Sequence, residues 1–216
     1  MRKLLLLIIV GVGVTLAATS IPANALLITF ELDEEYTGGA EPLESAPWLT
    51  ATFEDAGLNQ VSLTLDTEGL TGNEFVSNWF FNIQDGLIIT SVIPFFAIVQ
   101  AQDARHAGGA PGHGFDIEFE FPTAESERFG ADEIRVFLLG APGLTALSFE
   151  YLNAAGNFYS AAHVQSITND DFPWASSGWI GARRSIAAVP EPGTILLLGA
   201  GLAGLFGIRR FKFKKN

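Results

Sequence analysis

Three histidines are the first residues whose side chains could support chemistry. His106 and His113 lie seven residues apart in the glycine-rich stretch RHAGGAPGHG, and His163 lies in AAHVQ. Two histidines of one loop could bind zinc together with Asp103 or Asp116 as a further ligand. Their spacing matches no metal-binding motif, and the chain has no cysteine that could complete a site. We therefore expect solvated loop histidines, no metal site and no cofactor.

Acidic residues offer a second kind of chemistry. They cluster at Asp33-Glu34-Glu35, at Asp66 with Glu68, and at Asp170-Asp171. Loop carboxylates can bind calcium, which takes six to eight oxygen ligands, but the spacing matches no EF-hand. A pair of facing carboxylates could also hydrolyse polysaccharide, although no pair can be assigned. The sequence has no G-x-S-x-G nucleophile motif and no phosphate-binding loop, so we expect a protein that is not an enzyme.

Tryptophans suggest carbohydrate binding as an alternative. Trp174 lies in the turn-rich stretch DDFPWASSGW, beside two aspartates. An exposed indole face can stack on a sugar ring, whereas most tryptophans are packed at least partly in the core. Core packing is the expectation for Trp79 and Trp179. It is also favoured over sugar contact for Trp174, which is nevertheless the best candidate for a sugar-binding residue.

Charge is distributed unevenly along the chain. The four lysines lie at the extreme ends, while residues 26 to 187 contain five arginines and 23 acidic residues, a formal balance of 5 − 23 = −18. Such a body would repel nucleic-acid phosphates, so no nucleic-acid partner is expected. The excess of carboxylates is compatible with cation binding or simply with solubility outside the cell.

The region between residues 26 and 187 has the pattern of an all-β domain. Apolar and polar residues alternate with a period of two, as in GFDIEFEFP, where Phe115, Ile117, Phe119 and Phe121 are expected to face one way. Glycine-rich turn signals separate these short segments, which predicts an antiparallel β-sandwich, jelly-roll-like in type. Pro94 interrupts residues 87–103, which are therefore expected to form an edge strand or a loop. The other predicted strands are 27–32, 49–54, 61–66, 74–83, 114–122, 133–140, 144–152, 161–167 and 177–182.

The first 25 residues have the three parts of a secretory signal peptide. Arg2 and Lys3 form a positive start, and residues 4–18 form an apolar segment. Ala23 and Ala25 then fit the small-x-small rule for cleavage, which we predict after Ala25. The chain is thus expected to be exported across the inner membrane by the Sec machinery.

The last 29 residues, 188–216, combine an apolar segment with a basic end. Residues 194–208 carry no charge and would form a helix of roughly 22 Å, shorter than the ~30 Å hydrocarbon core of a bilayer. Basic residues that follow it can reach the interface and should hold this end in the cytoplasm. We therefore predict one short transmembrane helix over 194–208 and a basic tail over 209–216. The membrane-stop cluster consists of Arg209, Arg210, Lys212, Lys214 and Lys215.

A short motif precedes this helix. Val189, Pro190, Glu191 and Pro192 are followed by the Gly- and Leu-rich run and then by Arg209 and Arg210. Two prolines flanking a glutamate keep the segment extended, which is the form that a protease cleft accepts. This order of parts at the end of a chain with a signal peptide resembles the PEP-CTERM sorting signal.

The resemblance implies processing by exosortase, a membrane protease-transpeptidase of Gram-negative bacteria, and an association with exopolysaccharide and biofilm. It also implies transient anchoring in the inner membrane, followed by release to the cell surface or the extracellular matrix. The sequence thus predicts an exported, exosortase-processed, non-catalytic surface or matrix protein. The alternatives are a lectin-like module, possible with or without calcium, and a polysaccharide hydrolase.

Overall fold

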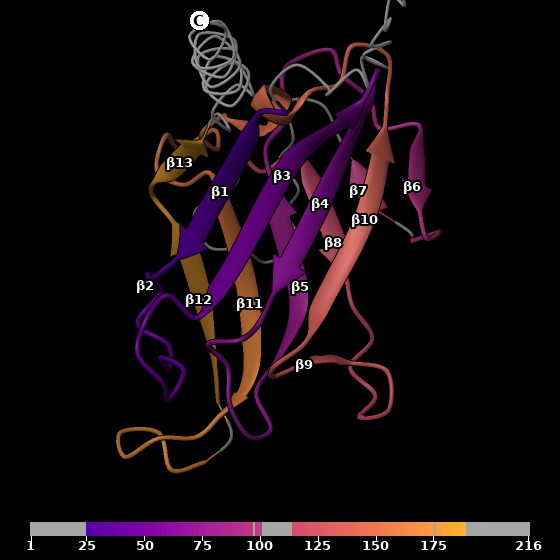
Figure 1. The fold of residues 1–216 in the computed structure, drawn as a ribbon. Coiled ribbons are helices and arrows are strands. Elements are labelled where there is room, and N and C mark those ends of the chain that lie inside the picture. The colour runs from indigo at the N-terminus through magenta and orange to yellow at the C-terminus, as the bar shows by residue number, and fades with distance from the viewer. Residues whose placement is uncertain (1–24, 97, 101–113, 175, 189–216) are drawn as a thin grey trace, which may run out of the picture. The chain divides into compact units, whose positions relative to one another are not determined.

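The computed structural model of the chain describes residues 25–96, 98–100, 114–174 and 176–188. Within them the chain forms two antiparallel sheets that pack face to face, so the predicted β-sandwich is confirmed (Figure 1). The first sheet has the order β13-β1-β3-β4-β10-β6, and the second has the order β2-β12-β11-β5-β8-β7, with β9 pairing β5. The predicted C-terminal transmembrane helix and all of the predicted signal peptide except its last residue, Ala25, lie outside the described residues.

Most strands lie where the alternating pattern predicts them. The strands are β1 (Leu27–Leu32), β2 (Glu34–Glu35), β3 (Leu49–Gly57), β4 (Gln60–Asp66), β5 (Phe75–Phe81), β6 (Ser91–Ile93), β7 (Ile98–Gln100), β8 (Ile117–Glu120), β9 (Phe129–Gly130), β10 (Ile134–Gly140), β11 (Ser160–Ile167), β12 (Ser176–Ala182) and β13 (Ser185–Ala188). β6 and β7 are edge strands of opposite sheets on either side of Pro94, as the prediction for residues 87–103 requires.

Alternate residues of the strands build one core between the sheets. In β1 the buried side chains are Ile28, Phe30 and Leu32, while the residues between them are only half-buried. Aromatic rings join the two layers: Phe53 of the first sheet meets Phe81 of the second edge-on, with ring centroids 5.1 Å apart. Burying large aromatic side chains in this way contributes much of the stability of a sandwich.

A second apolar cluster covers the outer face of the second sheet. Phe80, Phe115, Phe158 and Ala161 are buried in it, and Trp179 packs against it. The prediction that Phe115 shares a face with Ile117 is therefore wrong. β8 begins only at Ile117, and Phe115 precedes it beside Gly114, whose φ of +91° is left-handed, so Phe115 packs on Phe80 instead of in the main core.

The predicted strand over residues 144–152 is also wrong, because residues Ala146–Phe149 form a 3₁₀-helix, η1. Local hydrogen bonds stabilise it: Ser148 N–H donates to the Thr145 carbonyl (3.0 Å), and Thr145 N–H donates to Ser148 Oγ (3.1 Å). Asp55 Oδ1 accepts from Ala146 N–H at 2.7 Å. Serine and threonine thus compete with strand pairing here, while Ala146 and Phe149 still reach the core.

The start of β1 and the end of β13 lie side by side at the same end of the sandwich. β1 and β13 pair in an antiparallel register that places Leu27 opposite Ala188 (Figure 1). Leu27 also pairs with Glu54 of β3, and the β3–β4 hairpin lies just beyond that point. Leu27, the second residue after the predicted signal cleavage, and Ala188, at which the sorting segment begins, are therefore neighbours.

Candidate functional site

The last strand of the body, β13, is held in place by strand pairing and by a side-chain hydrogen bond. β13 pairs β1 through four residue pairs, and Ser185 Oγ donates to Glu150 Oε1 at 2.9 Å. Ala187 and Ala188 are the last two residues of this strand. Only Val189 separates the last paired residue from Pro190, so the Pro-Glu-Pro motif follows the folded body almost directly.

Trp174 lies in a turn that projects it into solvent. Asn169 Oδ1 accepts the backbone N–H groups of Asp171 (3.1 Å) and Phe172 (2.8 Å), and Asn169 Nδ2 donates to the Glu41 carbonyl (3.0 Å). Phe172 packs against the main core, whereas Trp174 is 81% exposed. The favoured prediction of core packing is therefore wrong for Trp174, because the Asn169 turn and Phe172 anchor the loop without it.

The other tryptophans pack against the body. Trp48 and Trp79 are buried in the main core, and Trp79 Nε1 donates to Ser160 Oγ at 2.9 Å. Trp179 is half-buried on the outer face and stacks on His163, with ring centroids 4.6 Å apart. Core packing is thus confirmed for Trp79, while Trp179 packs in the outer cluster.

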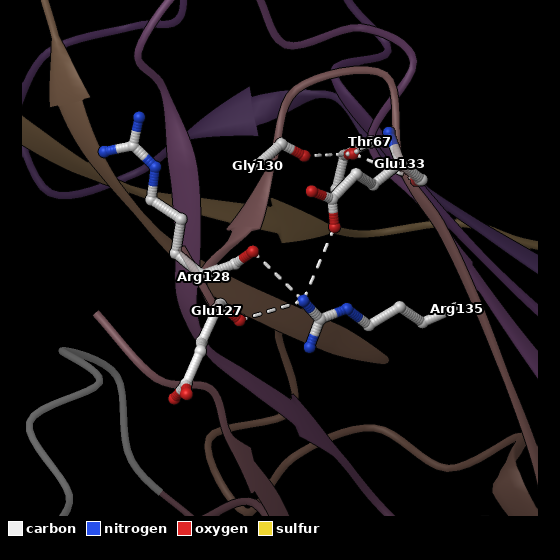
Figure 2. Close-up of polar contacts among 6 residues, drawn as sticks. All are labelled: Thr67, Glu127, Arg128, Gly130, Glu133 and Arg135. Carbon is white, nitrogen blue, oxygen red and sulfur yellow. Dashed lines mark hydrogen bonds and ion pairs between the residues drawn. The ribbon is translucent and has the colours of Figure 1, made fainter. Parts of the chain in front are cut away.

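Polar contacts hold the loops at the end of the sandwich opposite to the start of β1 and the end of β13 (Figure 2). The hydroxyl of Thr67, which is fully buried, donates to the Gly130 carbonyl (2.6 Å) and accepts from Glu133 N–H (3.0 Å). Arg135 Nη2 donates to the carbonyls of Glu127 (3.1 Å) and Arg128 (3.0 Å). These contacts join β4, β9 and β10, so we assign them a structural role.

Arg135 also packs against aromatic rings. Its guanidinium carbon lies 4.7 Å from the ring centroid of Phe129 and 5.3 Å from that of Phe121. It forms an ion pair with Glu133, with Nη2 to Oε2 at 3.4 Å. Because these partners already engage the guanidinium, we assign Arg135 a structural role and do not consider it a candidate for ligand binding.

His163 lies on β11 and is engaged with its neighbours. Its Nδ1 lies 3.1 Å from Ser77 Oγ, and its ring stacks on Trp179. Burial lowers the pKa of His163, because removal from water disfavours the charged imidazolium. His106 and His113 lie outside the described residues.

The acidic clusters are mostly used within the body. Glu34 pairs with Arg183, whose hydrogen bond lowers the pKa of Glu34, and the Glu35 carboxylate accepts from the backbone N–H groups of Thr37 and Gly38. Asp66 Oδ1 accepts from Glu68 N–H at 2.8 Å. Across the described ranges, no three histidine or acidic side chains are placed to hold a metal ion.

Two carboxylates that the sequence analysis did not single out bridge separate loops. Glu74 is 3% exposed and accepts from Leu43 N–H (3.1 Å) and Thr71 N–H (2.8 Å). Asp55 accepts from Ala146 N–H (2.7 Å) and, over 3.4 Å, from Leu26 N–H. No sequence motif identifies them as bridges, because Leu43, Leu26 and Ala146 are distant from them in the chain and only Thr71 is close to Glu74.

All but one of the residues predicted to direct processing lie outside the described part of the chain. They are Ala23, Val189, Pro190, Glu191, Pro192, Arg209, Arg210, Lys212, Lys214 and Lys215, whereas Ala25 is the first described residue and is half-buried. Among the residues described, no helix is long and apolar enough to cross a membrane.

Comparison with known proteins identifies one segment of the chain. The PEP-CTERM protein-sorting motif matches residues 188–210, which begin at the last residue of β13. No curated protein and no solved structure matches the chain. The resemblance noted from the sequence is thereby confirmed: the chain ends in a PEP-CTERM sorting motif, which implies export, C-terminal anchoring in the membrane and targeting to exosortase.

Proposed function

We propose that this chain is a non-catalytic protein of the cell surface or extracellular matrix, associated with exopolysaccharide and biofilm. In this proposal the Sec machinery exports it, and exosortase releases it from the inner membrane at the Pro190-Glu191-Pro192 motif. The observation that carries the proposal is the sorting motif at residues 188–210. An acidic, cysteine-free β-sandwich is also compatible with solubility outside the cell.

Mass spectrometry of the C-terminal peptide tests the processing step. In a host that contains exosortase, we expect mature protein that has been cut at the Pro-Glu-Pro motif and has lost the apolar segment and the basic tail, residues 194–216. The Pro190→Ala/Pro192→Ala variant should keep its tail, since both residues that restrain the cleavage segment are removed. Pro142→Ala, in an exposed turn of the body, is the matched control. Native protein that ends in FKFKKN would overturn the proposal.

The exposure of Trp174 favours a second candidate function, carbohydrate binding. The loop that carries Trp174 is held by Asn169 and Phe172, so its backbone needs little further ordering when the exposed indole contacts a ligand. Asp170 and Asp171 are exposed beside it and could accept hydrogen bonds from sugar hydroxyls.

A glycan array, run with and without a chelator, tests this candidate. We expect Trp174→Ala to abolish glycan binding with unchanged stability, because the side chain is exposed. Leu43→Ala, an exposed apolar residue in a different loop, should leave binding unchanged. Glycan binding that survives Trp174→Ala, or no binding by the native protein, would rule out this site.

A further inference from the structure

Large apolar side chains are exposed at one end of the sandwich. Leu58 at the tip of the β3–β4 hairpin is 89% exposed, Ile88 is 58% exposed and Leu147 of η1 is 52% exposed. Tyr151 and Leu152, which follow η1, are exposed as well. We call this surface, made of Leu58, Ile88, Leu147, Tyr151 and Leu152, the apolar end. Solvent-exposed apolar side chains that gather in this way commonly mark a surface for protein or membrane contact.

Hydrogen bonds hold the loops that carry these side chains. Asn59 Oδ1 accepts from Gly143 N–H at 2.8 Å, which ties the hairpin to the turn after β10. Gln84 N–H donates to the Ser148 carbonyl at 2.7 Å, which ties residues 82–90 to η1. The apolar side chains therefore stay exposed because their loops are fixed, and they cannot readily fold back onto the body.

The apolar end is also the end at which the chain enters and leaves the body. Leu27, Glu54 and Ser62 form one row across the first sheet together with Ala188, and the tip of the hairpin lies beyond that row. Figure 1 shows the start of β1, the end of β13 and this hairpin at the same end of the sandwich. Five residues, 189–193, lie between Ala188 and Thr194, where the apolar segment of the sorting motif begins, and the six residue steps span at most about 22 Å.

Charge is segregated in the opposite sense. The loops at the far end, residues 36–48, 67–74, 121–133 and 168–174, contain ten acidic residues: Glu41, Glu44, Glu68, Glu74, Glu125, Glu127, Asp132, Glu133, Asp170 and Asp171. We call these loops the acidic end. The described loops at the apolar end, residues 55–59, 82–90, 114–116 and 141–159, contain four: Asp55, Asp85, Asp116 and Glu150.

We propose that the apolar end lies in the interfacial region of the inner membrane while the C-terminal segment anchors the chain there. The proposal rests on the anchoring that the sorting motif implies and does not depend on cleavage by exosortase. The short connection makes contact with the bilayer intramolecular, so a small apolar surface suffices. Repulsion between anionic headgroups and the acidic end favours the same orientation. The body would then stand upright, with Trp174 and the acidic end directed away from the membrane.

Site-specific fluorescence in vesicles tests this orientation. The chain has no cysteine, so a single introduced cysteine can carry an environment-sensitive dye. We would place the dye at Leu58→Cys and, as the matched control, at Leu43→Cys in the acidic end, since both leucines are exposed. The full chain would be produced in a host without exosortase and reconstituted into phosphatidylethanolamine–phosphatidylglycerol vesicles that contain a nitroxide-labelled lipid.

Strong quenching and a blue shift of the dye at position 58, with little change at position 43, is the expected result. An added Ile88→Asp/Leu147→Asp substitution should reduce quenching at position 58 at least twofold, while circular dichroism confirms that the body is folded. Equal quenching at both positions, quenching at neither, or a chain that does not float with the vesicles would overturn the proposal. A blue shift without nitroxide quenching would indicate contact with a second copy and would overturn it too. None of these results bears on cleavage, which the mass spectrometry tests separately.

Discussion

The two ends of the sandwich are held together in the same way but present different surfaces. At each end one carboxylate bridges two separate segments through backbone N–H groups: Asp55 joins Leu26 to Ala146, and Glu74 joins Leu43 to Thr71. What differs is the exposed surface: the apolar end exposes five large apolar side chains and few carboxylates, whereas the acidic end exposes mainly carboxylates together with Leu43, Trp174 and the adjoining Ile134. The contrast is therefore a property of the surface and does not arise because one end is loosely built.

Loss of the Glu74 carboxylate should have the largest effect on stability. Glu74→Gln replaces one accepting oxygen by an amide N–H group that faces a backbone donor, in a site that is 3% exposed. A hydrogen bond to a buried charged group contributes about 1.5–3 kcal/mol, so we expect the free energy of unfolding to fall by about 2–3 kcal/mol. Urea denaturation measures this fall. Glu68→Gln, an exposed glutamate in the same loop, should change it by less than ~0.5 kcal/mol.

Asp55→Asn should have a smaller effect of the same kind at the apolar end. Asp55 is half-buried, and its bond to Leu26 N–H is long at 3.4 Å, so we expect a loss of about 1–2 kcal/mol in urea denaturation. Glu54→Gln, its exposed neighbour, is the control. If Asp55→Asn were as costly as Glu74→Gln, the two bridges would be equivalent despite their different burial. If it had no effect, the apolar end would be held by other contacts.

Much of the fold follows from the sequence because alternation is a direct consequence of strand geometry. β1, β3, β4 and β10 lie on the predicted segments, since one face of each strand packs on the core; burial alternates in β1, β4 and the first half of β3, and in β10 from Val136 to Leu139. The pattern does not predict the short strands β2, β9 and β13, because two to four residues are too few to show a period. It also fails at η1, where serine and threonine hydrogen bonds override the apolar alternation.

The candidate sites also differ in whether the sequence alone predicts them. The sorting motif is a linear signal that requires no knowledge of the fold, and it was identified from its residues. The apolar end was not, because Leu58, Ile88 and Leu147 are separated in sequence and each looks like a core residue. Only the pairing of β3 with β4 and the position of η1 bring them to one end.

His163 lies on β11, between the two ends, and should make the free energy of unfolding depend on pH. This contribution must be separated from those of Asp55 and Glu74. Burial lowers the pKa of His163, so the folded protein binds a proton less readily than the unfolded chain. Stability should therefore be complete above the unfolded pKa near 6.5 and should fall as the pH drops below it toward the lowered folded pKa. His163→Phe preserves a ring beside Trp179 without a titratable group and should flatten the slope of stability between pH 6.5 and 5. Urea denaturation at several pH values measures this slope, and an unchanged slope would assign the dependence to other groups.

The ion pair between Glu34 and Arg183 should contribute least, although it lies where the chain passes from β12 to β13. Both side chains are more than 40% exposed, and exposed ion pairs typically contribute 0.2–1 kcal/mol, with screening by salt. A double-mutant cycle with Glu34→Gln and Arg183→Met should give a coupling of at most about 0.5 kcal/mol that shrinks in 1 M salt. The Arg183 guanidinium also lies 4.4 Å from the Phe158 ring centroid, so the single Arg183 variant should lose more free energy of unfolding than the coupling alone accounts for.

Because the hydrogen bond from Arg183 lowers the pKa of Glu34, the coupling should be present above the unfolded pKa of Glu34 and vanish as the pH falls through its folded pKa. A coupling above 1 kcal/mol that resists salt would contradict this prediction and would show that the ion pair adds to the pairing with β1 and to the Ser185–Glu150 hydrogen bond in holding β13.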